Sequence, residues 1–245
     1  MAEEQAKARE RGKGAGASPA RRASDRGRYG RLSRERVLAS ALELVDREGL
    51  SALSMRRLGA ELGVEAMALY RYASSKDALL DGLVEALYLE LEERLASGPA
   101  TALGARGELH RIARATYDVC QIHPQVVPLL ATRMLAVPLA RRPLATLRHH
   151  ERVIALLQES GLETTRTAVL FQAFTGWVLG YVSVELQAMV DSPEEPDPAF
   201  RLGLHRMPPQ ELPRLREAAT TLAEKGGPEG LAAGLDALLD RFAQE

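Results

Sequence analysis

Residues 32–87 decide the fold, and they read LSRERVLASALELVDREGLSALSMRRLGAELGVEAMALYRYASSKDALLDGLVEAL. Within this segment, residues 55–62 and 66–72 form two short helical stretches separated by Gly63. Ser54 marks the start of the first helix, because a serine hydroxyl can accept a backbone N–H of the first turn. Gly63 suits the sharp bend between the helices, since it has no Cβ. The second stretch is too short and too polar for a core helix, which favours a helix-turn-helix whose second helix enters a DNA major groove.

A family resemblance rests on two segments, ALELVDREGLSALSMRRLGAELGV and ALYRYASSKDALLD. Residues 32–92 resemble, without a gap, the DNA-binding domain of the tetracycline-repressor (TetR) family of bacterial transcriptional regulators. Within that family the stretch is most similar to the tetracycline-type repressors, and beyond about residue 100 the resemblance is one of pattern only. The resemblance implies an all-α fold with an N-terminal helix-turn-helix domain and a C-terminal helical domain for ligand binding and dimerisation.

The resemblance also implies which residues contact DNA. The matching positions are Ser54, Arg56, Ala66, Met67, Ala68, Tyr70, Arg71, Tyr72 and Lys76. Arg56 matches a position that reads a base edge, and an arginine can reach guanine O6 and N7 with two parallel hydrogen bonds. The alternative is an exposed arginine that pairs with Glu35 or Glu61.

The other positions of this set divide into groove and backbone contacts. Residues 66–68 match groove-facing positions that are often polar in the family, and here their apolar side chains suit contact with a thymine methyl. Tyr70 and Lys76 match phosphate contacts, and Lys76 also stands near a helix N-terminus, which favours anions. Arg71 and Tyr72 match residues at the edge of the groove.

Charge is distributed unevenly along a chain of ordinary soluble composition. The 245 residues are 46% hydrophobic and 27% charged, with a net charge of −1. Residues 1–30 hold eight basic and four acidic residues, a balance of +4, whereas residues 191–245 hold eleven acidic and six basic ones, a balance of −5. The basic end adjoins the predicted DNA-binding unit, as a polyanionic partner would favour.

Composition and turn signals predict three parts. Residues 1–31 are expected to be a disordered basic arm, either a solvated leader or a segment that lies along DNA. Residues 32–95 form the helix-turn-helix domain, whose last long helix starts at a capping box of Ser74 and Asp77. Residues 104–245 form the helical effector-binding and dimerisation domain. Its predicted helices cover 108–121, 126–132, 144–160, 163–190, 212–224 and 228–242, with a Pro-rich acidic loop at 191–211.

Cysteine content and the N-terminus indicate a cytoplasmic protein. Cys120 is the only cysteine, so an internal disulfide is excluded and a reducing compartment is expected. The N-terminus lacks the apolar run of a secretory signal.

Residues 167–184, TAVLFQAFTGWVLGYVSV, contain no charge. Eighteen residues reach the lower margin for a membrane span, but the polar Gln172, Thr175 and Ser183 interrupt the run. A helix that is apolar all round is otherwise buried all round. We therefore expect no membrane partner, and a helix with one side on its own domain and the other on a second subunit. With the final helix it would form the interface of a homodimer, with Leu235, Leu238 and Leu239 at the seam.

A pocket for a small, largely apolar effector is expected inside the C-terminal domain. Its expected residues are Tyr117, Gln121, His123, Arg133, Phe171, Gln172, Phe174, Trp177 and Tyr181, with plain core packing as the alternative for each. The tetracycline repressors bind a magnesium–drug complex partly through a histidine in a short helix. The corresponding residues here, 126–131, contain no histidine, so we expect neither a metal nor a cofactor.

Three functions remain in competition. The first is a homodimeric repressor that binds double-stranded, palindromic operator DNA and is released by its ligand; the second is a transcriptional activator or a constitutive DNA-binding protein without an effector. The third, an enzyme with an accessory helix-turn-helix, finds little support. The chain has no nucleophile elbow, P-loop or dinucleotide fingerprint, and its five histidines lack zinc-type spacing.

Overall fold

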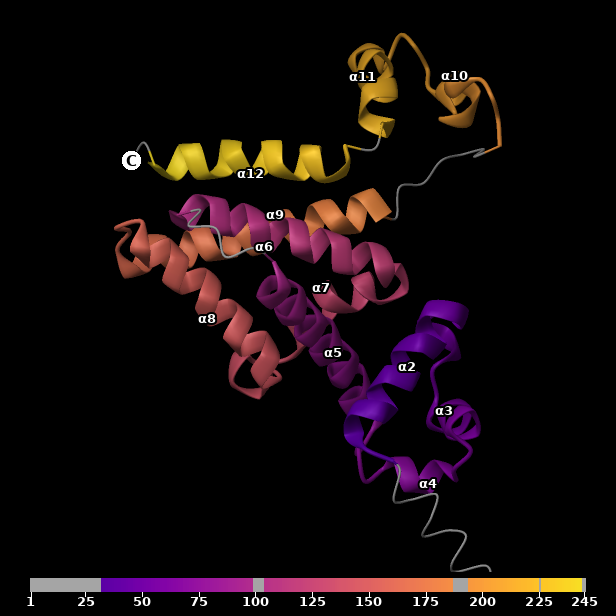
Figure 1. Ribbon diagram of the computed structural model, residues 1–245. Helices are drawn as coiled ribbons and strands as arrows, with labels where there is room; N and C mark the ends of the chain where they lie inside the picture. Colours follow the sequence, from indigo (N-terminus) through magenta and orange to yellow (C-terminus); the bar gives the residue numbers. More distant parts are fainter. Residues whose placement is uncertain (1–31, 99–103, 187–193, 225, 244–245) are drawn as a thin grey trace, which may run out of the picture.

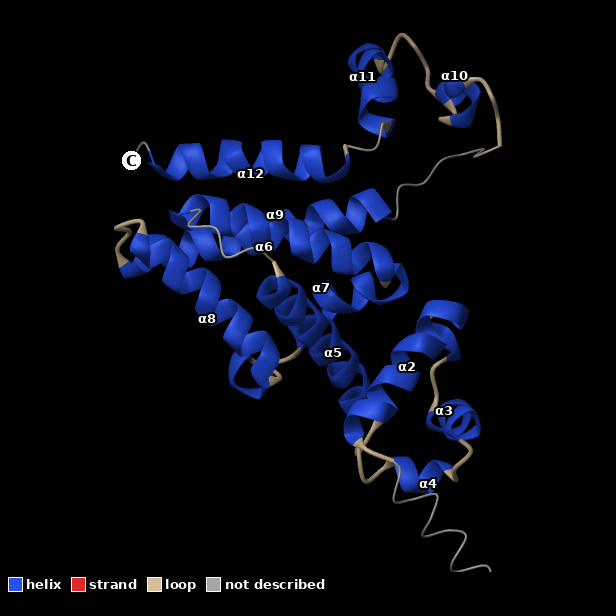
Figure 2. Cartoon of the chain, viewed as in Figure 1, coloured by secondary structure: helices blue, strands red, loops and turns tan. Residues whose placement is uncertain are grey.

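The computed structural model describes residues 32–98, 104–186, 194–224 and 226–243. Every regular element in these ranges is helical (Figure 2), which confirms the predicted all-α fold. The helices are, in chain order, α2 (Arg34–Glu48), α3 (Met55–Leu62), α4 (Ala66–Leu69), α5 (Lys76–Ser97), α6 (Gly104–Ile122), α7 (Val127–Ala136), α8 (Leu144–Glu159), α9 (Thr164–Leu186), α10 (Pro198–Arg201), α11 (Pro213–Ala223) and α12 (Gly227–Ala243). The predicted basic arm at 1–31 lies outside the described residues.

Two groups of helices are joined by α5. We call α2, α3, α4 and the first turns of α5 the head, and α6 to α9 with α12 and the rest of α5 the body. Figure 1 shows the head at one end of the molecule, with α4 at its far side from the body. Helix α5 packs against α2 in the head and against α6, α7 and α8 in the body. Helix α5 is therefore shared between the head and the body.

Local chemistry sets the helix boundaries in the head. The Ser33 hydroxyl accepts a hydrogen bond from Arg36 N at 3.2 Å and starts α2, and the Ser54 hydroxyl accepts one from Arg57 N at 3.1 Å and starts α3. Helix α3 ends at Gly63, whose φ of +66° is left-handed. The expected capping box at Ser74 is wrong by one residue: Ser75 caps α5, accepting from Ala78 N at 3.0 Å.

The head has its own compact core beneath these helices. Its fully buried side chains include Leu44, Leu53, Leu58, Leu69, Leu79 and Leu83. Gly82 of α5 allows α2 to approach closely, because a Cβ there would overlap the Leu38 side chain. The same packing positions α3 and α4 on a rigid base, since α3 packs against both α2 and α4.

Helix α9 buries one side against its own subunit. The buried residues follow helical spacing: Thr167, Leu170, Phe174, Val178 and Val182. That side packs on α6, α7, α8 and α12. By length and composition α9 is the one helix in the described ranges that is able to cross a membrane. Its opposite side carries apolar residues that no described helix covers, Val169 and Val184 among them.

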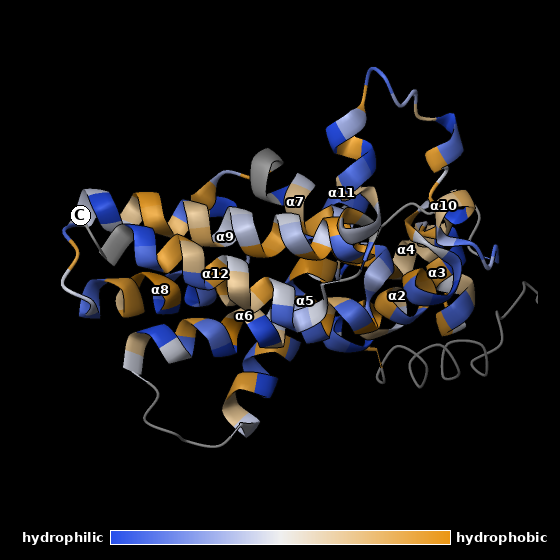
Figure 3. Cartoon of the chain, turned by 90° about the horizontal axis from the view of Figure 1, so that it is seen from above, coloured by the Kyte–Doolittle hydropathy of each residue, from blue (hydrophilic) through white to orange (hydrophobic). Residues whose placement is uncertain are grey.

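Helix α12 covers another part of α9 (Figure 3), and two glycines allow the close approach. The Trp177 indole N–H donates to Leu231 O at 3.1 Å, and the Tyr181 hydroxyl donates to Gly227 O at 2.7 Å. A Cβ at Gly234 would overlap the Trp177 ring, and one at Gly230 would overlap the Tyr181 hydroxyl. These contacts determine how closely α12 lies against α9.

The segment before α12 is more ordered than the expected Pro-rich loop. Asp197 caps the short helix α10 by accepting from Ala199 N at 2.8 Å, and a further helical turn covers Leu204–Arg206. Residues 191–193 of that predicted loop lie outside the described part of the chain. Figure 1 shows α10 and α11 set apart from the helices of the body.

Candidate nucleic-acid interface and ligand cavity

Helices α3 and α4 form the bend that the sequence predicted. Gly59 of α3 faces the start of α4, where a Cβ would lie 2.9 Å from Val64 O and 3.3 Å from Ala66 N. The two helices therefore touch backbone to backbone, which holds α4 at a fixed angle. Leu58 and Leu69 are fully buried beneath them. The exposed side of this pair is the candidate nucleic-acid interface.

Most of the predicted DNA-contacting residues lie exposed on this part of the head. Met67 is 76% exposed and Tyr70 is 45% exposed. Arg71 is exposed in the turn after α4, and Lys76 is exposed at the first position of α5. Their placement provides apolar groups and positive charges on one surface.

Three predicted contacts have structural roles instead or in addition. Ala68 is only 6% exposed, so the expectation that it faces a groove is corrected: its methyl group packs into the head. Ala66 is half-buried beside it. The Tyr72 hydroxyl donates to Leu32 O at 2.8 Å and fixes the start of α2. Ser54 is exposed but already accepts the N–H of Arg57 as the N-cap of α3.

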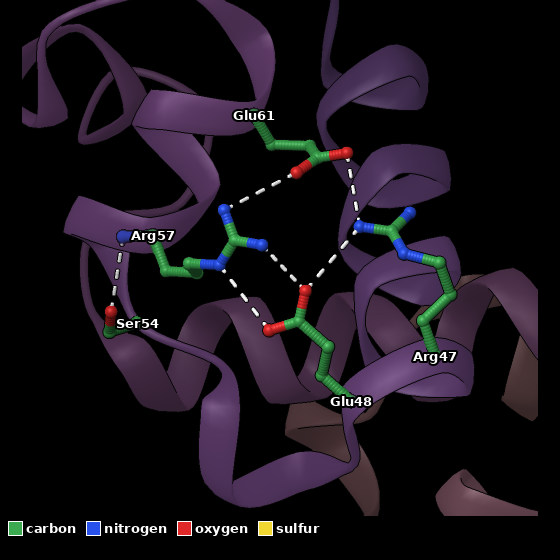
Figure 4. Close-up of polar contacts among 5 residues, drawn as sticks. All are labelled: Arg47, Glu48, Ser54, Arg57 and Glu61. Carbon is green, nitrogen blue, oxygen red and sulfur yellow. Dashed lines mark hydrogen bonds and ion pairs between the residues drawn. The ribbon is translucent and has the colours of Figure 1, made fainter.

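Adjacent arginines on α3 have different surroundings. Figure 4 shows Arg57 held by two carboxylates: its Nε lies 3.3 Å from Glu48 Oε2, and its guanidinium lies 3.5 Å from Glu61 Oε2. Arg47 of α2 completes the group at 3.1 Å from Glu61. Arg56 has no hydrogen-bond or ion-pair partner in the described ranges, so the expected alternative pairing with Glu61 does not occur.

The ion-pair group joins α2 to α3. Hydrogen bonding from Arg57 lowers the pKa of Glu48, so this carboxylate stays charged at neutral pH. The charges around Arg57 cancel, because two arginines pair with two glutamates. The Arg56 side chain is exposed, and none of its N–H groups has a partner in the described ranges. The Arg57–Glu61 spacing of four residues was the sequence signal for this group, and the sequence analysis missed it.

A cavity lies between five helices of the body. Its walls are Leu87, Tyr88, Leu91, Thr116, Val119, Cys120, Leu130, His149, Phe174, Thr175, Val178 and Leu179. None of these residues is an acid, a lysine or an arginine. The cavity volume is about 30 Å³, room for roughly two water molecules. Any larger ligand therefore requires the walls to move apart.

Few of the predicted effector contacts line this cavity. Of the nine predicted residues, only Phe174 lines it. Trp177 and Tyr181 face α12 and donate hydrogen bonds to its backbone. Phe171 lies against the edge of His150, with ring centroids 5.2 Å apart. Their closeness in sequence suggested that these four aromatic residues line one pocket, with the dimer seam as the alternative for Trp177. Successive helical turns instead place them against different partners.

The polar members of the predicted set are occupied or exposed. Gln172 is exposed on α9. The Gln121 amide donates to the Tyr117 hydroxyl at 3.2 Å, so these two satisfy each other outside the cavity. Tyr117 is itself buried in the core. None of the three lines the cavity.

His123 and Arg133 connect the body to the head. The His123 ring lies 2.7 Å from Asp46 Oδ2 of α2 through Nδ1 and 2.9 Å from Glu90 Oε2 of α5 through Nε2. Arg133 of α7 donates from Nε to Asp81 Oδ1 of α5 at 2.7 Å. These contacts make both residues structural links rather than cavity walls.

Two buried histidines of α8 were not among the predicted effector contacts. His149 and His150 are adjacent and both buried, and His149 lines the cavity. Burial lowers the pKa of His149 to about 3 and that of His150 to about 4, so both are neutral at pH 7. The signal was their position on the core face of α8, in register with Thr146, Val153 and Leu157.

Known proteins match both parts of the chain. Residues 37–83 match the profile of "Bacterial regulatory proteins, tetR family", and residues 100–243 match "Tetracyclin repressor-like, C-terminal domain". The chain is 32% identical over 167 residues to the HTH-type transcriptional repressor DrrR1 of Streptomyces coeruleorubidus, which covers 67% of this chain and 58% of the repressor. The chain thus spans somewhat under two thirds of that relative.

Two further proteins cover more of the chain. It is 28% identical over 220 residues to the tetracycline repressor protein class D of Escherichia coli, covering 86% of this chain and 89% of the repressor. The TetR family protein ActR of Streptomyces coelicolor, in complex with (S)-DNPA, has a TM-score of 0.68 and 22% identity, covering 86% of this chain and 97% of ActR. This last likeness shows a shared fold.

Proposed function

This chain belongs to the tetR family of bacterial regulatory proteins, and from that premise we propose that it is a homodimeric repressor that a ligand releases from operator DNA. One observation carries the proposal. Helix α5 bears Lys76, exposed at the interface end, and Leu87, Tyr88 and Leu91, which line the cavity. A ligand that parts the cavity walls therefore moves the helix that positions the DNA-reading head.

The proposed reading surface consists of Arg56, Met67, Tyr70, Arg71 and Lys76. The free guanidinium of Arg56 suits a guanine edge, and the exposed Met67 suits a thymine methyl in the major groove. The tyrosine and the two other basic residues suit phosphates, which supply sequence-independent affinity. Ser54 and Ala66 lie at its border, and Tyr72 supports it from behind.

Replacing Arg56 with alanine is expected to weaken operator binding by about 1–3 kcal/mol and to relax specificity at one base pair. Thermal stability should not change, because Arg56 has no partner in the described ranges. Fluorescence anisotropy on the operator and on random duplex measures both affinities. The control is Arg57→Ala, which loosens α3 from α2 and should weaken binding to both duplexes alike. An equal loss on both duplexes for Arg56→Ala would reduce that residue to a phosphate contact.

The proposed effector is small, uncharged and largely apolar, and it binds without a metal or a cofactor. The cavity walls are mostly aliphatic and aromatic and bear no charged side chain. Among the described residues there is no group of acidic, histidine and cysteine side chains able to hold a metal ion. ActR, a protein of the same fold, is described in complex with the small molecule (S)-DNPA.

We infer that the links through His123 and Arg133 transmit ligand binding to the head. Arg133 is 17% exposed and contacts Asp77 at 3.2 Å and Asp81 at 2.5 Å. Both carboxylates belong to the first two turns of α5, the helix that starts at Lys76. A ligand changes DNA affinity only if it binds more tightly to one placement of the head relative to the body. The contacts of His123 and Arg133 hold that placement, so they are where ligand binding acts on the head.

Substituting Arg133 with leucine is expected to weaken ligand-driven release by about tenfold, while DNA affinity without ligand changes little. The leucine keeps an aliphatic side chain next to the backbone but removes the ion pairs that join α7 to α5. Release is measured by displacing labelled operator with a ligand. Arg148→Leu is the matched control, since Arg148 is exposed on α8 and unpaired in the described ranges. Normal release by Arg133→Leu would exclude this route.

The proposed dimer uses the uncovered face of α9. Val169, Gly176, Gly180 and Val184 lie on this face at helical spacing, and no described atom lies within 4 Å of a Cβ at either glycine. Of the three seam residues expected on α12, Leu235 is fully buried and Leu239 is 9% exposed within one subunit, whereas Leu238 is half-buried. Small residues on α9 allow a two-fold copy of the helix to approach closely.

A competition assay separates this proposal from a constitutive DNA-binding protein. The protein is bound to its operator, and small aromatic compounds are titrated until the duplex is displaced. Displacement supports a ligand-released regulator. A transcription assay on the same operator then distinguishes repression from activation. A protein that binds DNA but is released by no compound would support the constitutive alternative.

A further inference from the structure

Helix α8 buries polar atoms that have no hydrogen-bond partner. Among the described residues these atoms are Thr146 Oγ1, His149 Nδ1 and both ring nitrogens of His150. The other two such atoms, Asp46 Oδ1 and Glu92 Oε1, belong to carboxylates whose second oxygen is bonded. Leaving a buried polar group unpaired costs about 1–3 kcal/mol. Such groups therefore need an explanation, and a missing ligand is one.

His149 is the member of this cluster that lines the cavity. It is 8% exposed, and no hydrogen bond joins either of its ring nitrogens to the described part of the chain. The ring of Tyr88 lies against it, with centroids 5.1 Å apart. Tyr88 lines the same cavity, and its hydroxyl has no partner among the described residues. Two polar groups with unused hydrogen-bonding capacity thus line a cavity whose remaining hydroxyl groups belong to Thr116 and Thr175.

The polar groups of the cavity are uncharged. Burial raises the pKa of Tyr88 to about 12 and lowers that of His149 to about 3, so neither ionises near neutral pH. Thr116 donates to Ile112 O of its own helix at 2.9 Å and keeps only acceptor capacity. An anion or a cation in this space would lose its hydration without gaining an opposite charge. A neutral group that both donates and accepts is the suitable partner.

We propose that His149, together with Tyr88, selects an uncharged aromatic effector that carries a hydroxyl group. The ring of the effector would occupy the apolar walls, and its hydroxyl would hydrogen-bond to a ring nitrogen of His149 and to the Tyr88 oxygen. This inference rests on the proposed ligand-released function. Because the cavity holds only about 30 Å³, entry of an aromatic ring requires α5, α8 and α9 to separate.

Binding of paired probes to the full chain tests this selection without DNA. The probes are 2-naphthol and naphthalene, which differ by one hydroxyl, and isothermal calorimetry measures their affinities. Wild-type protein is expected to bind 2-naphthol about tenfold more tightly. His149→Leu, which replaces the imidazole by an aliphatic group of similar size, should bind both probes equally. The matched control is His205→Leu, whose histidine is exposed and stacks on Phe200 outside the body.

Stability without ligand provides a second readout. If His149 is unpaired in the free protein, His149→Leu removes a buried unsatisfied group and raises the melting temperature by about 2–4 °C. A lower melting temperature would mean that His149 is a structural residue and would overturn the proposal. So would equal affinity of wild-type protein for both probes, discrimination that persists in His149→Leu, or no binding of 2-naphthol up to its solubility limit.

Operator binding, measured separately without probes, keeps the two proposals distinct. If the wild-type protein bound no DNA sequence specifically, the proposed function would be contradicted, but the probe result would still stand. Normal DNA binding with no discrimination between the probes would contradict only the role of His149.

Discussion

A single aspartate in place of Val184 is expected to convert the dimer into a monomer and to weaken operator binding by about 10²–10⁴-fold. Val184 is 73% exposed near the end of α9, on the same face as Val169 and Gly180. A two-fold axis brings the same face of both subunits together, so two carboxylates would be buried at one seam. A monomer would then bind only one half-site and lose the affinity that comes from binding both half-sites at once.

Sedimentation velocity measures the oligomeric state of this variant, and fluorescence anisotropy measures its affinity for the operator. The control is Leu144→Asp, at a leucine that is 58% exposed at the start of α8. An acidic residue at a helix N-terminus is favourable, so this control should stay dimeric and fully active. A Val184→Asp protein that still sediments as a dimer would exclude the α9 face as the interface.

The second large effect is expected at Gly234, where alanine should destabilise the body by about 2 kcal/mol. Its methyl group would overlap the Trp177 ring, which is fixed by the hydrogen bond to Leu231 O. Either α12 moves away from α9 or the indole loses that bond. Thermal or urea unfolding measures the loss, and Trp177, the only tryptophan, reports it by fluorescence.

Gly176→Ala is the matched control for this change. The substitution is the same, also in a helix, but no described atom lies within 4 Å of a Cβ at Gly176. Alanine exceeds glycine in helix propensity by about 1 kcal/mol, so the isolated subunit should gain stability. If the two α9 helices approach closely, the same control should weaken dimerisation. Because Gly176 also lies on the proposed dimer face, both variants are compared as monomers in the Val184→Asp background. Equal stability there would contradict the described packing of α12.

The head follows from its sequence because its signals are local. The predicted serine cap at Ser54 and the predicted bend at Gly63 each act within one turn of the chain, and the structure has both. The family and the all-α fold, predicted from the resemblance of residues 32–92, are confirmed. The start of α5 shows the limit of such local signals. Ser74 and Ser75 are adjacent, and the sequence alone does not decide which hydroxyl accepts the backbone N–H of the first turn.

The body was harder to predict, because one helix does not reveal its neighbours. Periodicity predicted a long apolar helix at 163–190, and Thr164–Leu186 is helical in the described residues, but periodicity did not show that Trp177 and Tyr181 face α12. The missed signal was the glycine spacing in α12, where Gly230 and Gly234 stand four apart opposite two large rings. Likewise, His123 was predicted to line the pocket. Its two carboxylate partners lie 77 and 33 positions away, so the sequence did not show that they are its neighbours.

Selection of bound duplexes from random DNA tests the central claim most directly. Two α3–α4 heads related by a two-fold axis are expected to select an inverted repeat, with half-site centres about 34–36 Å apart or a multiple of that distance. Repeating the selection with Arg56→Ala should relax one symmetric pair of positions in the same repeat. Recovery of direct repeats alone, or of no enriched sequence, would contradict the account.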